Sequence, residues 1–413
     1  MTERRIKKQI SGALDDFKII YIAGARRVGK TTLIRQLQDQ MDLTYISFDD
    51  PMVREKVKQA PDFFLNTSDY PLAIDEVQKL PEIVDYIKMK VDTDQNYGLF
   101  VLTGSGNLFH NPLVYESLSG RIAIFTLYPL SSSEIAGYKK NFVETLFDED
   151  FYEGLKERSL TDLNTFKNKL IAGQFPELAL GKVKNRSLWF KSYLGTRLNK
   201  DLRDLTVKGL HRLDVMPKLL KSLAGSAGSL INLSNIAKDF KLNYKTVKSY
   251  LGYLEALFMI EFLQPYYQNI SKQVTKTPKV YLIDTGLMAY LLGLTTQNLD
   301  LFSSWFGHLL ENYIYLELRK EISYSSHEFG LHYFRDAYKN EVDFVIENFS
   351  GELIGIEVKT KTVIKNSDLA GLRSFYNKYG NRVKNMFVFY GGEDFSALKL
   401  QDKLVYLVPW RIM

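Results

Sequence analysis

The chain has 413 residues, of which 45% are hydrophobic and 25% are charged, and its formal net charge is +6 at pH 7. This composition is that of a globular protein, and the length predicts two or three domains. The absence of cysteine excludes disulfide and thiolate chemistry. No apolar run is long enough to span a bilayer, and no apolar signal core follows the basic N-terminal residues, so we expect a cytoplasmic protein without a membrane partner. The mild positive charge permits a nucleic-acid partner without requiring one.

The first predicted strand, Lys18–Ala23, ends in a glycine-rich loop. Gly24, Gly29, Lys30 and Thr31 match the spacing G-x-x-x-x-G-K-[ST], and a helical pattern follows. Glycines let the backbone curl so that its N–H groups converge, and a helix N-terminus adds partial positive charge. Lysine reaches the β- and γ-phosphates and the hydroxyl ligates Mg²⁺. The motif therefore predicts a phosphate-binding loop, with ATP and Mg²⁺ as cofactors.

The loop also contributes residues outside the motif positions. Arg26 and Arg27 either contact the nucleotide or remain solvated. The predicted nucleotide-binding residues are Gly24, Ala25, Arg26, Arg27, Val28, Gly29, Lys30, Thr31 and Thr32.

Residues 1–135 alternate between strand and helix patterns, which predicts a mostly parallel sheet. At the end of the third strand, Asp75 and Glu76 form the Walker B pattern. We expect Asp75 to bind Mg²⁺ and Glu76 to orient and polarise the attacking water, because neighbouring strand residues point apart. The five predicted strands are Lys18–Ala23, Leu43–Phe48, Leu72–Ile74, Leu99–Leu102 and Ile122–Leu127.

Two further catalytic candidates lie near the last two strands of this region. If the fourth strand lies between the P-loop and Walker B strands, its tip approaches the γ-phosphate, and we select Ser105 there, with Thr103 and Asn107 as alternatives. A plain Gly-Ser turn is the competing interpretation. Arg121 precedes the fifth strand and is either an arginine that stabilises the transferring phosphoryl group, in cis or on a neighbouring subunit, or a surface residue.

Several motifs together resemble the archaeal-ATPase-like branch of AAA-type ATPases. They are Gly-x-Arg-x-Val-Gly-Lys-Thr-Thr-Leu, Asp-Glu-Val-Gln-Lys-Leu-Pro, Leu-Thr-Gly-Ser, and Ser-Gly-Arg-Ile followed by Tyr-Pro-Leu-Ser-x-x-Glu. Ala25 stands where that family has proline, and Arg27 where glutamine is common. The resemblance covers nearly the whole chain and implies ATP binding and a C-terminal domain of unknown function, but no particular process.

Residues 136–225 are predicted to form a helical lid and linker. The segment ending in Gln-Phe-Pro-Glu177 resembles a signature of the same family, and its glycine and proline predict a turn. Arg197 and Arg203 lie on a helical segment of mixed charge, where they either reach the nucleotide or form surface ion pairs.

Residues 226–295 have the pattern of a winged helix. Leu233–Phe240 predicts an N-capped helix, Thr246–Leu257 predicts a second helix, and Ile260–Pro265 and Lys279–Asp284 supply wing strands. Tyr244, Lys245, Lys248 and Ser249 are expected on the outer face of the second helix. That face either meets DNA or packs against protein.

Residues 296–413 hold a second constellation of charged residues. Asp343 and Glu357 lie on two strands joined as a hairpin, and Lys359 shares one strand face with Glu357. This arrangement resembles the PD-(D/E)XK nuclease core, in which the acids bind Mg²⁺ and the lysine acts on the hydrolytic water. Glu311 resembles the extra acid of the first helix in that core. The competing interpretations are a stabilised hairpin or an inactive binding module, and His308 is expected to pack rather than ligate.

The sequence therefore predicts an α/β protein with a P-loop ATPase domain, a helical and winged-helix middle, and a C-terminal nuclease-like α/β domain. We expect Mg²⁺-dependent ATP hydrolysis in which Lys30, Glu76, Ser105 and Arg121 are the catalytic candidates. The alternatives are an ATP-gated DNA nuclease and a nucleotide-controlled regulator with negligible turnover. DNA, a protein partner and a second copy of the chain remain open as partners.

Overall fold

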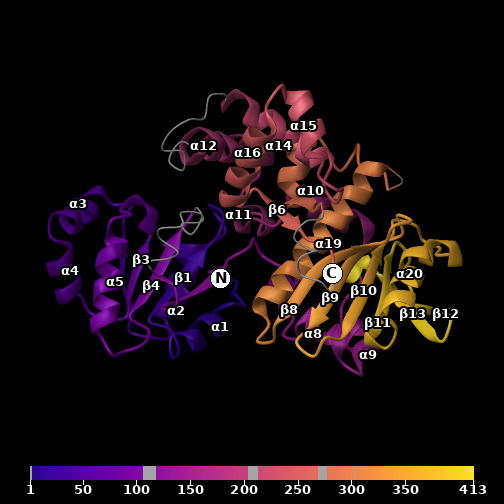
Figure 1. Cartoon of the computed structure of the whole chain (residues 1–413), viewed down its shortest axis with the longest axis horizontal. Coiled ribbons are helices and arrows are strands. Elements are labelled where there is room, and N and C mark those ends of the chain that lie inside the picture. The colour runs from indigo at the N-terminus through magenta and orange to yellow at the C-terminus, as the bar shows by residue number, and fades with distance from the viewer. Residues whose placement is uncertain (1, 106–117, 203–212, 268–276, 302) are drawn as a thin grey trace. The chain divides into compact units, whose positions relative to one another are not determined.

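The computed structural model describes residues 2–105, 118–202, 213–267, 277–301 and 303–413, and for residues 199, 200 and 213 the backbone alone. The chain divides into two compact units, which are described separately (Figure 1). Unit 1 comprises residues 1–130 with 175–177 and 253–259. Unit 2 comprises residues 131–174, 178–252 and 260–413.

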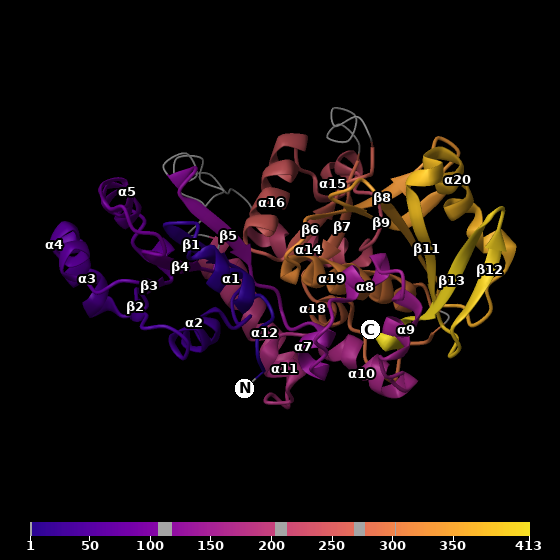
Figure 2. The same ribbon diagram turned by 90° about the horizontal axis from the view of Figure 1, so that it is seen from below.

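Unit 1 is built on a five-stranded parallel sheet of order β2-β3-β4-β1-β5. Helices α1 and α2 lie on one face and α5 on the other (Figure 2). The inner strands are buried on both faces, as their continuous apolar runs predict. The strands are β1 (Ile19–Ala23), β2 (Thr44–Ser47), β3 (Leu72–Asp75), β4 (Phe100–Gly104) and β5 (Ile122–Thr126). The helices are α1 (Lys7–Ala13), α2 (Lys30–Gln38), α3 (Pro51–Gln59), α4 (Pro61–Thr67) and α5 (Ile83–Thr93).

The predicted strands of unit 1 differ from the observed ones only at their ends. β4 lies between β1 and β3, as the interpretation of Ser105 requires. Because the strands are parallel, their carboxyl ends meet at one edge of the sheet, where Ala23 pairs with Gly104. The P-loop, the Walker B acids and Ser105 therefore follow strands that end side by side.

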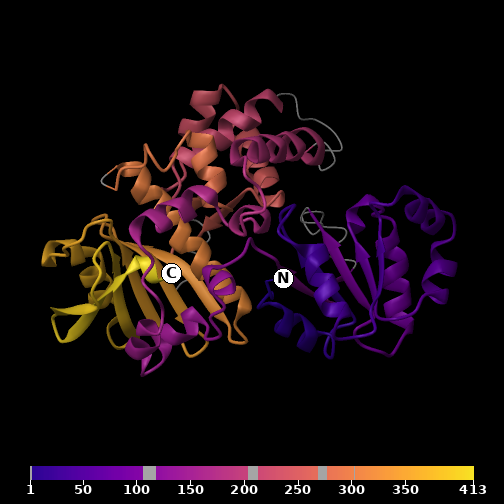
Figure 3. The same ribbon diagram turned by 180° about the vertical axis from the view of Figure 1, so that it is seen from behind.

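The first part of unit 2 is mostly helical, as predicted (Figure 1, and from behind in Figure 3). Its helices are α7 (Ser132–Ala136), α8 (Phe142–Phe147), α9 (Phe151–Lys156), α10 (Leu163–Ala172), α11 (Pro176–Ala179), α12 (Arg186–Thr196), α14 (Met216–Gly225), α15 (Leu233–Phe240), α16 (Tyr244–Ala256) and α18 (Thr285–Leu292). β6 (Ile260–Leu263) pairs with β7 (Lys279–Leu282) in an antiparallel pair.

The second part of unit 2 is a six-stranded mixed sheet of order β12-β13-β11-β10-β9-β8. The antiparallel β8–β9–β10 meander is followed by α20 and by β11, which is parallel to β10. The helices are α19 (Ser304–Tyr324) and α20 (Ala370–Tyr379). The strands are β8 (Phe329–Arg335), β9 (Glu341–Asn348), β10 (Leu353–Val358), β11 (Val383–Tyr390), β12 (Ser396–Leu400) and β13 (Lys403–Pro409).

Side-chain alternation on β11 gives the sheet two apolar faces. Phe387 and Phe389 contact Phe151 and Phe142 of the N-terminal helices of unit 2, with ring centroids 5.4 and 6.0 Å apart. Met386 and Val388 belong instead to the core that contains Leu372 and Phe375 of α20, together with other apolar side chains. Because both faces are buried, the register of β11 is fixed by packing on each side.

The Tyr-Pro-Leu-Ser-x-x-Glu motif has a structural role at the start of unit 2. Ser131 and Glu134 form a capping box at the N-terminus of α7. The backbone N–H of Ser132 donates to the carboxylate of Glu317 on α19 at 2.8 Å, and its hydroxyl lies 2.6 Å from that of Tyr313. The motif thus anchors α7 to the long helix α19 through buried hydrogen bonds.

Candidate functional site

The P-loop brings its lysine back over its own backbone. Gly29 has φ of +99°, a left-handed conformation that favours glycine, and α2 begins at the next residue. The ammonium of Lys30 donates to the carbonyls of Gly24 at 3.0 Å and Ala25 at 3.1 Å. Lys30 is 5% exposed, and its ammonium lies inside the loop against these two carbonyls.

Asp75 ends β3 directly beside the P-loop. Its Oδ2 accepts from the hydroxyls of Thr31 at 2.8 Å and Tyr45 at 3.0 Å, and its Oδ1 accepts from the hydroxyl of Thr103. Burial, with the nearby Asp75 carboxylate, raises the pKa of Tyr45 to about 12. All of these donors to Asp75 are neutral hydroxyls, so its negative charge has no cation among them. The hydroxyl of Thr31 and the carboxylate of Asp75 are the hard oxygen ligands that suit Mg²⁺.

Glu76 is turned away from the strand by an unusual backbone conformation. Its φ is +56°, which a non-glycine residue adopts at a cost of about 1–3 kcal/mol. The Glu76 carboxylate accepts from the hydroxyl of Ser105 at 3.0 Å and from the side-chain amide of Gln78. That amide also donates to the hydroxyl of Ser105 at 3.0 Å. Glu76, Gln78 and Ser105 therefore form one polar cluster at the ends of β3 and β4.

The structure places each of the other residues selected for nucleotide binding. Val28 is fully buried, and its carbonyl accepts from the guanidinium of Arg4 at 2.8 Å. The same guanidinium donates to the carbonyl of Tyr128 at 2.7 Å, so it links the loop to the segment after β5. Ala25 is buried, Thr32 and Arg26 are partly exposed, and Arg27 has φ of +64°. Asn107, an alternative to Ser105, lies outside the described residues.

Sequence reasoning missed three residues of this site. Tyr45 and Arg4 lie outside the quoted motifs, and Gln78 lies in the Asp-Glu-Val-Gln-Lys-Leu-Pro motif without an assigned role. Thr103 was named only as an alternative to Ser105 in sensing phosphate. A polar residue at the end of a buried strand is the signal that was available for Thr103. Arg4 was not detectable, because its partners are backbone carbonyls 24 and 124 residues away.

Arg121 lies away from the P-loop within unit 1. It precedes β5, and its carbonyl accepts from the N–H of Ile19, the first residue of β1. The P-loop follows the last residue of that strand, whereas Arg121 lies where the strands begin. Arg121 and the P-loop are therefore at opposite ends of the parallel strands. The guanidinium of Arg121 pairs with Asp92 and donates to the carbonyl of Ser119 at 3.2 Å. This placement does not bring Arg121 to the nucleotide site of its own chain.

The two arginines of the middle region do not form a described site. Arg197 is completely buried and donates to Asp201 at 2.7 Å within a π-helical turn. Arg203 lies outside the described residues. On α19, Nδ1 of His308 lies 2.8 Å from the carbonyl of Ala227, so His308 has a packing partner.

In unit 2, the acids of the C-terminal constellation surround a lysine. The ammonium of Lys279 on β7 lies 3.0 Å from Glu311, 2.6 Å from Glu341 and 3.6 Å from Asp343. Glu341 also accepts from Arg335 at 2.8 Å. Burial alone would lower the pKa of Lys279, but the three carboxylates outweigh it and raise that pKa. The sequence assigned Lys279 only to a wing strand and did not select Glu341.

Glu357 is not one of the three carboxylates that pair with Lys279, and it is buried against α20. A Cβ on Gly371 of α20 would lie 2.4 Å from the Glu357 carboxylate, so this close approach requires glycine. Oε2 of Glu357 accepts a hydrogen bond from the ammonium of Lys359 at 2.7 Å. Burial raises the pKa of Glu357 to about 8, and the charge of Asp343 acts in the same direction. Asp343 in turn accepts from the backbone N–H of Val358 at 2.8 Å.

The C-terminal acids do not fit the predicted Mg²⁺ site. In the part of the chain that the structure describes, no group of three or more histidine, aspartate or glutamate residues is arranged to hold a metal ion. Glu311, Asp343, Glu357 and Lys359 are near one another, but ammonium groups contact the carboxylates. Mg²⁺ requires oxygens at about 2.0–2.1 Å, which these ammonium groups obstruct.

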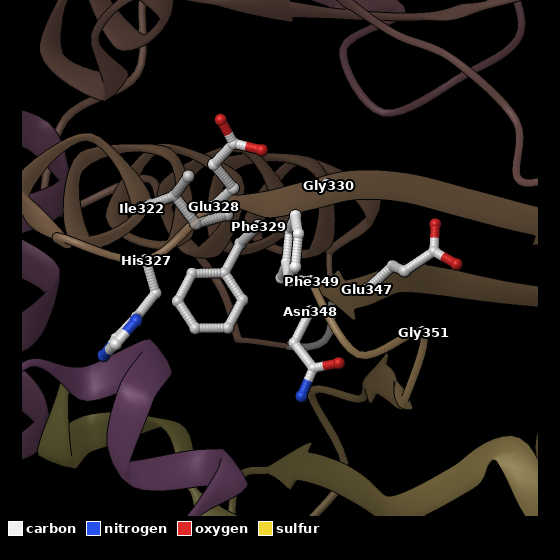
Figure 4. A pocket seen from close by; sticks show the side chains of 9 residues that line it. All are labelled: Ile322, His327, Glu328, Phe329, Gly330, Glu347, Asn348, Phe349 and Gly351. Carbon is white, nitrogen blue, oxygen red and sulfur yellow. The ribbon is translucent and has the colours of Figure 1, made fainter.

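One open pocket lies at an edge of the six-stranded sheet, away from these residues. It extends from the end of α19 to the β9–β10 turn, and its lining includes Phe329, Glu347 and Phe349 (Figure 4). None of the residues predicted from the sequence lines it. The pocket therefore adds no chemistry to either constellation.

The sheet order, the glycine loop and the adjoining Asp75 and Glu76 define unit 1 as a P-loop domain of the AAA type. The family described as "AAA domain" matches residues 16–136. This match supports the predicted resemblance of unit 1 to AAA-type P-loop ATPases. Two families described as domains of unknown function, DUF8612 and DUF4143, match residues 163–298 and 306–413.

The curated relatives and the solved structures that resemble this chain do not assign an activity to it. Uncharacterized proteins Rv2008c of Mycobacterium tuberculosis and Mb2031c of Mycobacterium bovis are each 25% identical over 365 residues, covering 87% of this chain and 74% of theirs. The Walker-type ATPase of Pyrococcus abyssi is 15% identical, with a TM-score of 0.41 over 70% of this chain and 96% of that one. The Thermotoga maritima RuvB Holliday junction branch migration motor is 19% identical, with a TM-score of 0.29 over 62% and 88%. No helix among the described residues is long and apolar enough to cross a membrane.

Proposed function

We propose that unit 1 binds MgATP and hydrolyses it. The observation that carries this proposal is the contact between Thr31 and Asp75, which places a hydroxyl and a carboxylate together beside the P-loop lysine. Lys30 would leave the loop carbonyls and bind the β- and γ-phosphates, and Thr31 and Asp75 would hold Mg²⁺. When bound, Mg²⁺ neutralises charge that develops on the phosphate oxygens.

Glu76 would position the attacking water. Its hydrogen bonds to Ser105 and Gln78 fix the carboxylate at the ends of β3 and β4, where β4 adjoins the P-loop strand. A carboxylate with neutral donors keeps its charge and accepts a hydrogen bond from water. Ser105 would thus act by holding the Glu76 carboxylate in place and by lying beside the position of the attacking water.

Nucleotide binding is tested with Lys30→Ala. The variant loses the main cation at the phosphates, so calorimetry should show little or no MgATP binding. Lys58→Ala on α3 removes one charge from an exposed position and is the matched control. Unchanged affinity in Lys30→Ala would contradict the P-loop assignment.

A second proposal concerns the helix pair α15–α16, which with β6 and β7 has the elements of a winged helix. Tyr244, Lys245, Lys248 and Ser249 of α16 are all exposed, as predicted, and Tyr244 is 54% exposed. Basic, tyrosine-containing helix faces suit contact with phosphates and the major groove. We propose that this face binds duplex DNA.

The DNA proposal is tested by charge reversal. Lys245→Glu with Lys248→Glu should weaken duplex binding and reduce the steepness of its salt dependence by about two phosphate contacts. Lys56→Glu with Lys58→Glu on α3 makes the same charge change at exposed positions of unit 1. Equal binding by both double variants would show that α16 is not the contact.

A regulator with negligible turnover and an ATP-gated nuclease are the alternatives. The first differs from our proposal in turnover alone, and the presence of Glu76 favours turnover. We do not propose DNA cleavage by Asp343, Glu357 and Lys359, because the additional ammonium of Lys279 lies among the neighbouring acids. A protein partner and self-association remain open.

A further inference from the structure

The carboxylates of the C-terminal cluster already surround a positively charged side chain of the chain itself. One atom, Nζ of Lys279, lies within 3.6 Å of Glu311, Glu341 and Asp343, which come from a helix and from strand β9. We propose that Lys279 is a permanent internal counter-ion in the place where a divalent metal would bind these acids. The position between Glu311, Glu341 and Asp343 is then filled by an ammonium of the chain itself.

The other partners of these acids complete the arrangement. Tyr281, two residues after Lys279 on β7, donates its hydroxyl to Glu311 at 2.8 Å. Arg335 neutralises the second oxygen of Glu341, and the N–H of Val358 occupies the second oxygen of Asp343. Glu311 and Glu341 therefore each have two donors, and Asp343 has one donor and the Lys279 ammonium at 3.6 Å. Such partners lower the cost of burying charge.

Lys279 is also held in place. It is 1% exposed, and its strand β7 is buried along its whole length. Leu263 of β6 pairs with it on one side, and an isolated bridge to Leu230 lies on the other. A Cβ on Gly228, in the neighbouring turn, would lie 2.8 Å from the Glu311 carboxylate, so that turn closes directly over the acid. Because the strand that carries Lys279 is buried and paired on both sides, its ammonium stays among these carboxylates and competes with a metal ion for their oxygens.

The distances exclude simultaneous occupancy. An ammonium nitrogen 2.6–3.0 Å from two carboxylates fills the space between them. A divalent ion bound by the same oxygens at about 2.0–2.4 Å would lie almost on the nitrogen and be repelled by its charge. Mg²⁺ and Lys279 are therefore alternatives, and the lysine is covalently part of the chain.

The test is whether removal of the lysine creates a metal site. All proteins carry Asp75→Asn, which weakens the separate metal site of unit 1, and no nucleotide is added. Binding of Mn²⁺ is counted by electron paramagnetic resonance with the full chain bearing Lys279, Lys279→Ala or Lys279→Met. We expect no C-terminal ion with Lys279 and one ion gained in each variant. Adding Asp343→Asn to either variant should weaken Mn²⁺ binding about tenfold or more.

Two controls make the result decisive. Lys399→Ala removes one exposed ammonium from β12, in the six-stranded sheet that also carries Asp343, and this variant should gain no ion. Mn²⁺ should also raise the melting temperature of Lys279→Met and leave that of the chain with Lys279 unchanged, since only the variant has uncompensated acids.

Three outcomes would overturn the proposal. One is a Mn²⁺ ion bound in the presence of Lys279 and removed by Asp343→Asn. Another is a folded Lys279→Met that gains no ion, which would show that the acids do not form a cation position. If neither variant folds, the proteins with Lys279 decide: a melting temperature that Mn²⁺ raises and Asp343→Asn makes insensitive overturns the proposal, and an insensitive one supports it.

Discussion

The two acid clusters of this chain have similar residues and different counter-charges. In unit 1, Asp75 and Glu76 are held by hydroxyl and amide donors, and Lys30 is held by loop carbonyls. In unit 2, Glu311, Glu341 and Asp343 surround the ammonium of Lys279. The first arrangement leaves negative charge for a metal and a substrate to neutralise. The second already contains a cation from the chain itself, which shows that the donors around a carboxylate decide its chemistry as much as the motif does.

The largest effect is expected where an acid does chemistry. Glu76→Gln keeps the shape and hydrogen bonding of the side chain but removes the charge that orients water. ATP turnover should fall by about 10²–10⁴-fold, the range for loss of a general base, while MgATP affinity stays the same. Steady-state turnover and calorimetry measure the two quantities, and Glu82→Gln, exposed at the start of α5, is the control. Wild-type turnover would place the catalytic role elsewhere.

The next effect concerns stability in unit 2. Lys279→Ala leaves buried carboxylates without their common cation, so the free energy of unfolding should fall by about 3–5 kcal/mol. Lys30→Ala removes hydrogen bonds to two neutral loop carbonyls, and the loss of these bonds should cost about 1 kcal/mol. Urea unfolding compares the two, and equal losses would remove the distinction between the clusters.

A pH dependence should separate them further. Burial raises the pKa of Glu357 from 4.5 to about 8 in the folded chain, so the folded state binds the proton more tightly than the unfolded state. Stability from this group is therefore complete below about pH 4.5 and is lost as pH rises through 8. Relative to Glu357→Gln, the wild-type free energy of unfolding should fall by more than about 1 kcal/mol across this window. Urea titrations at several pH values measure it, with the exposed Glu328→Gln as control. A constant difference would mean that the folded pKa is not raised.

The smallest effect is expected at Arg121. Its contact with Asp92 is a partly exposed ion pair, so Arg121→Ala should change the free energy of unfolding by less than about 1 kcal/mol. At protein concentrations where the chain is monomeric, turnover should be unaffected, because Arg121 is at the far edge of its own sheet. Turnover that rises with concentration and is lost in the variant would instead place Arg121 at a neighbouring subunit's nucleotide.

Much of unit 1 was determined by local sequence. Glycines at Gly24 and Gly29, followed by Lys30 and a helix, specify a loop whose geometry depends on a few adjacent residues. Buried parallel strands are continuous apolar runs, so their positions were predicted closely. The C-terminal hairpin was also predicted, because β9 and β10 are adjacent in the chain.

Tertiary structure alone decided the chemistry of the acids. Lys279 reaches Glu311 and Asp343 across 32 and 64 residues of chain, and no local pattern indicates that a wing-strand lysine is buried there. Arg4 likewise reaches the P-loop through backbone carbonyls, which are the same in every residue and leave no signal in the sequence. Local sequence therefore indicated that Asp75 ends a strand and that Asp343 lies on a hairpin. Packing over long chain separations determined whether hydroxyls or an ammonium would meet them.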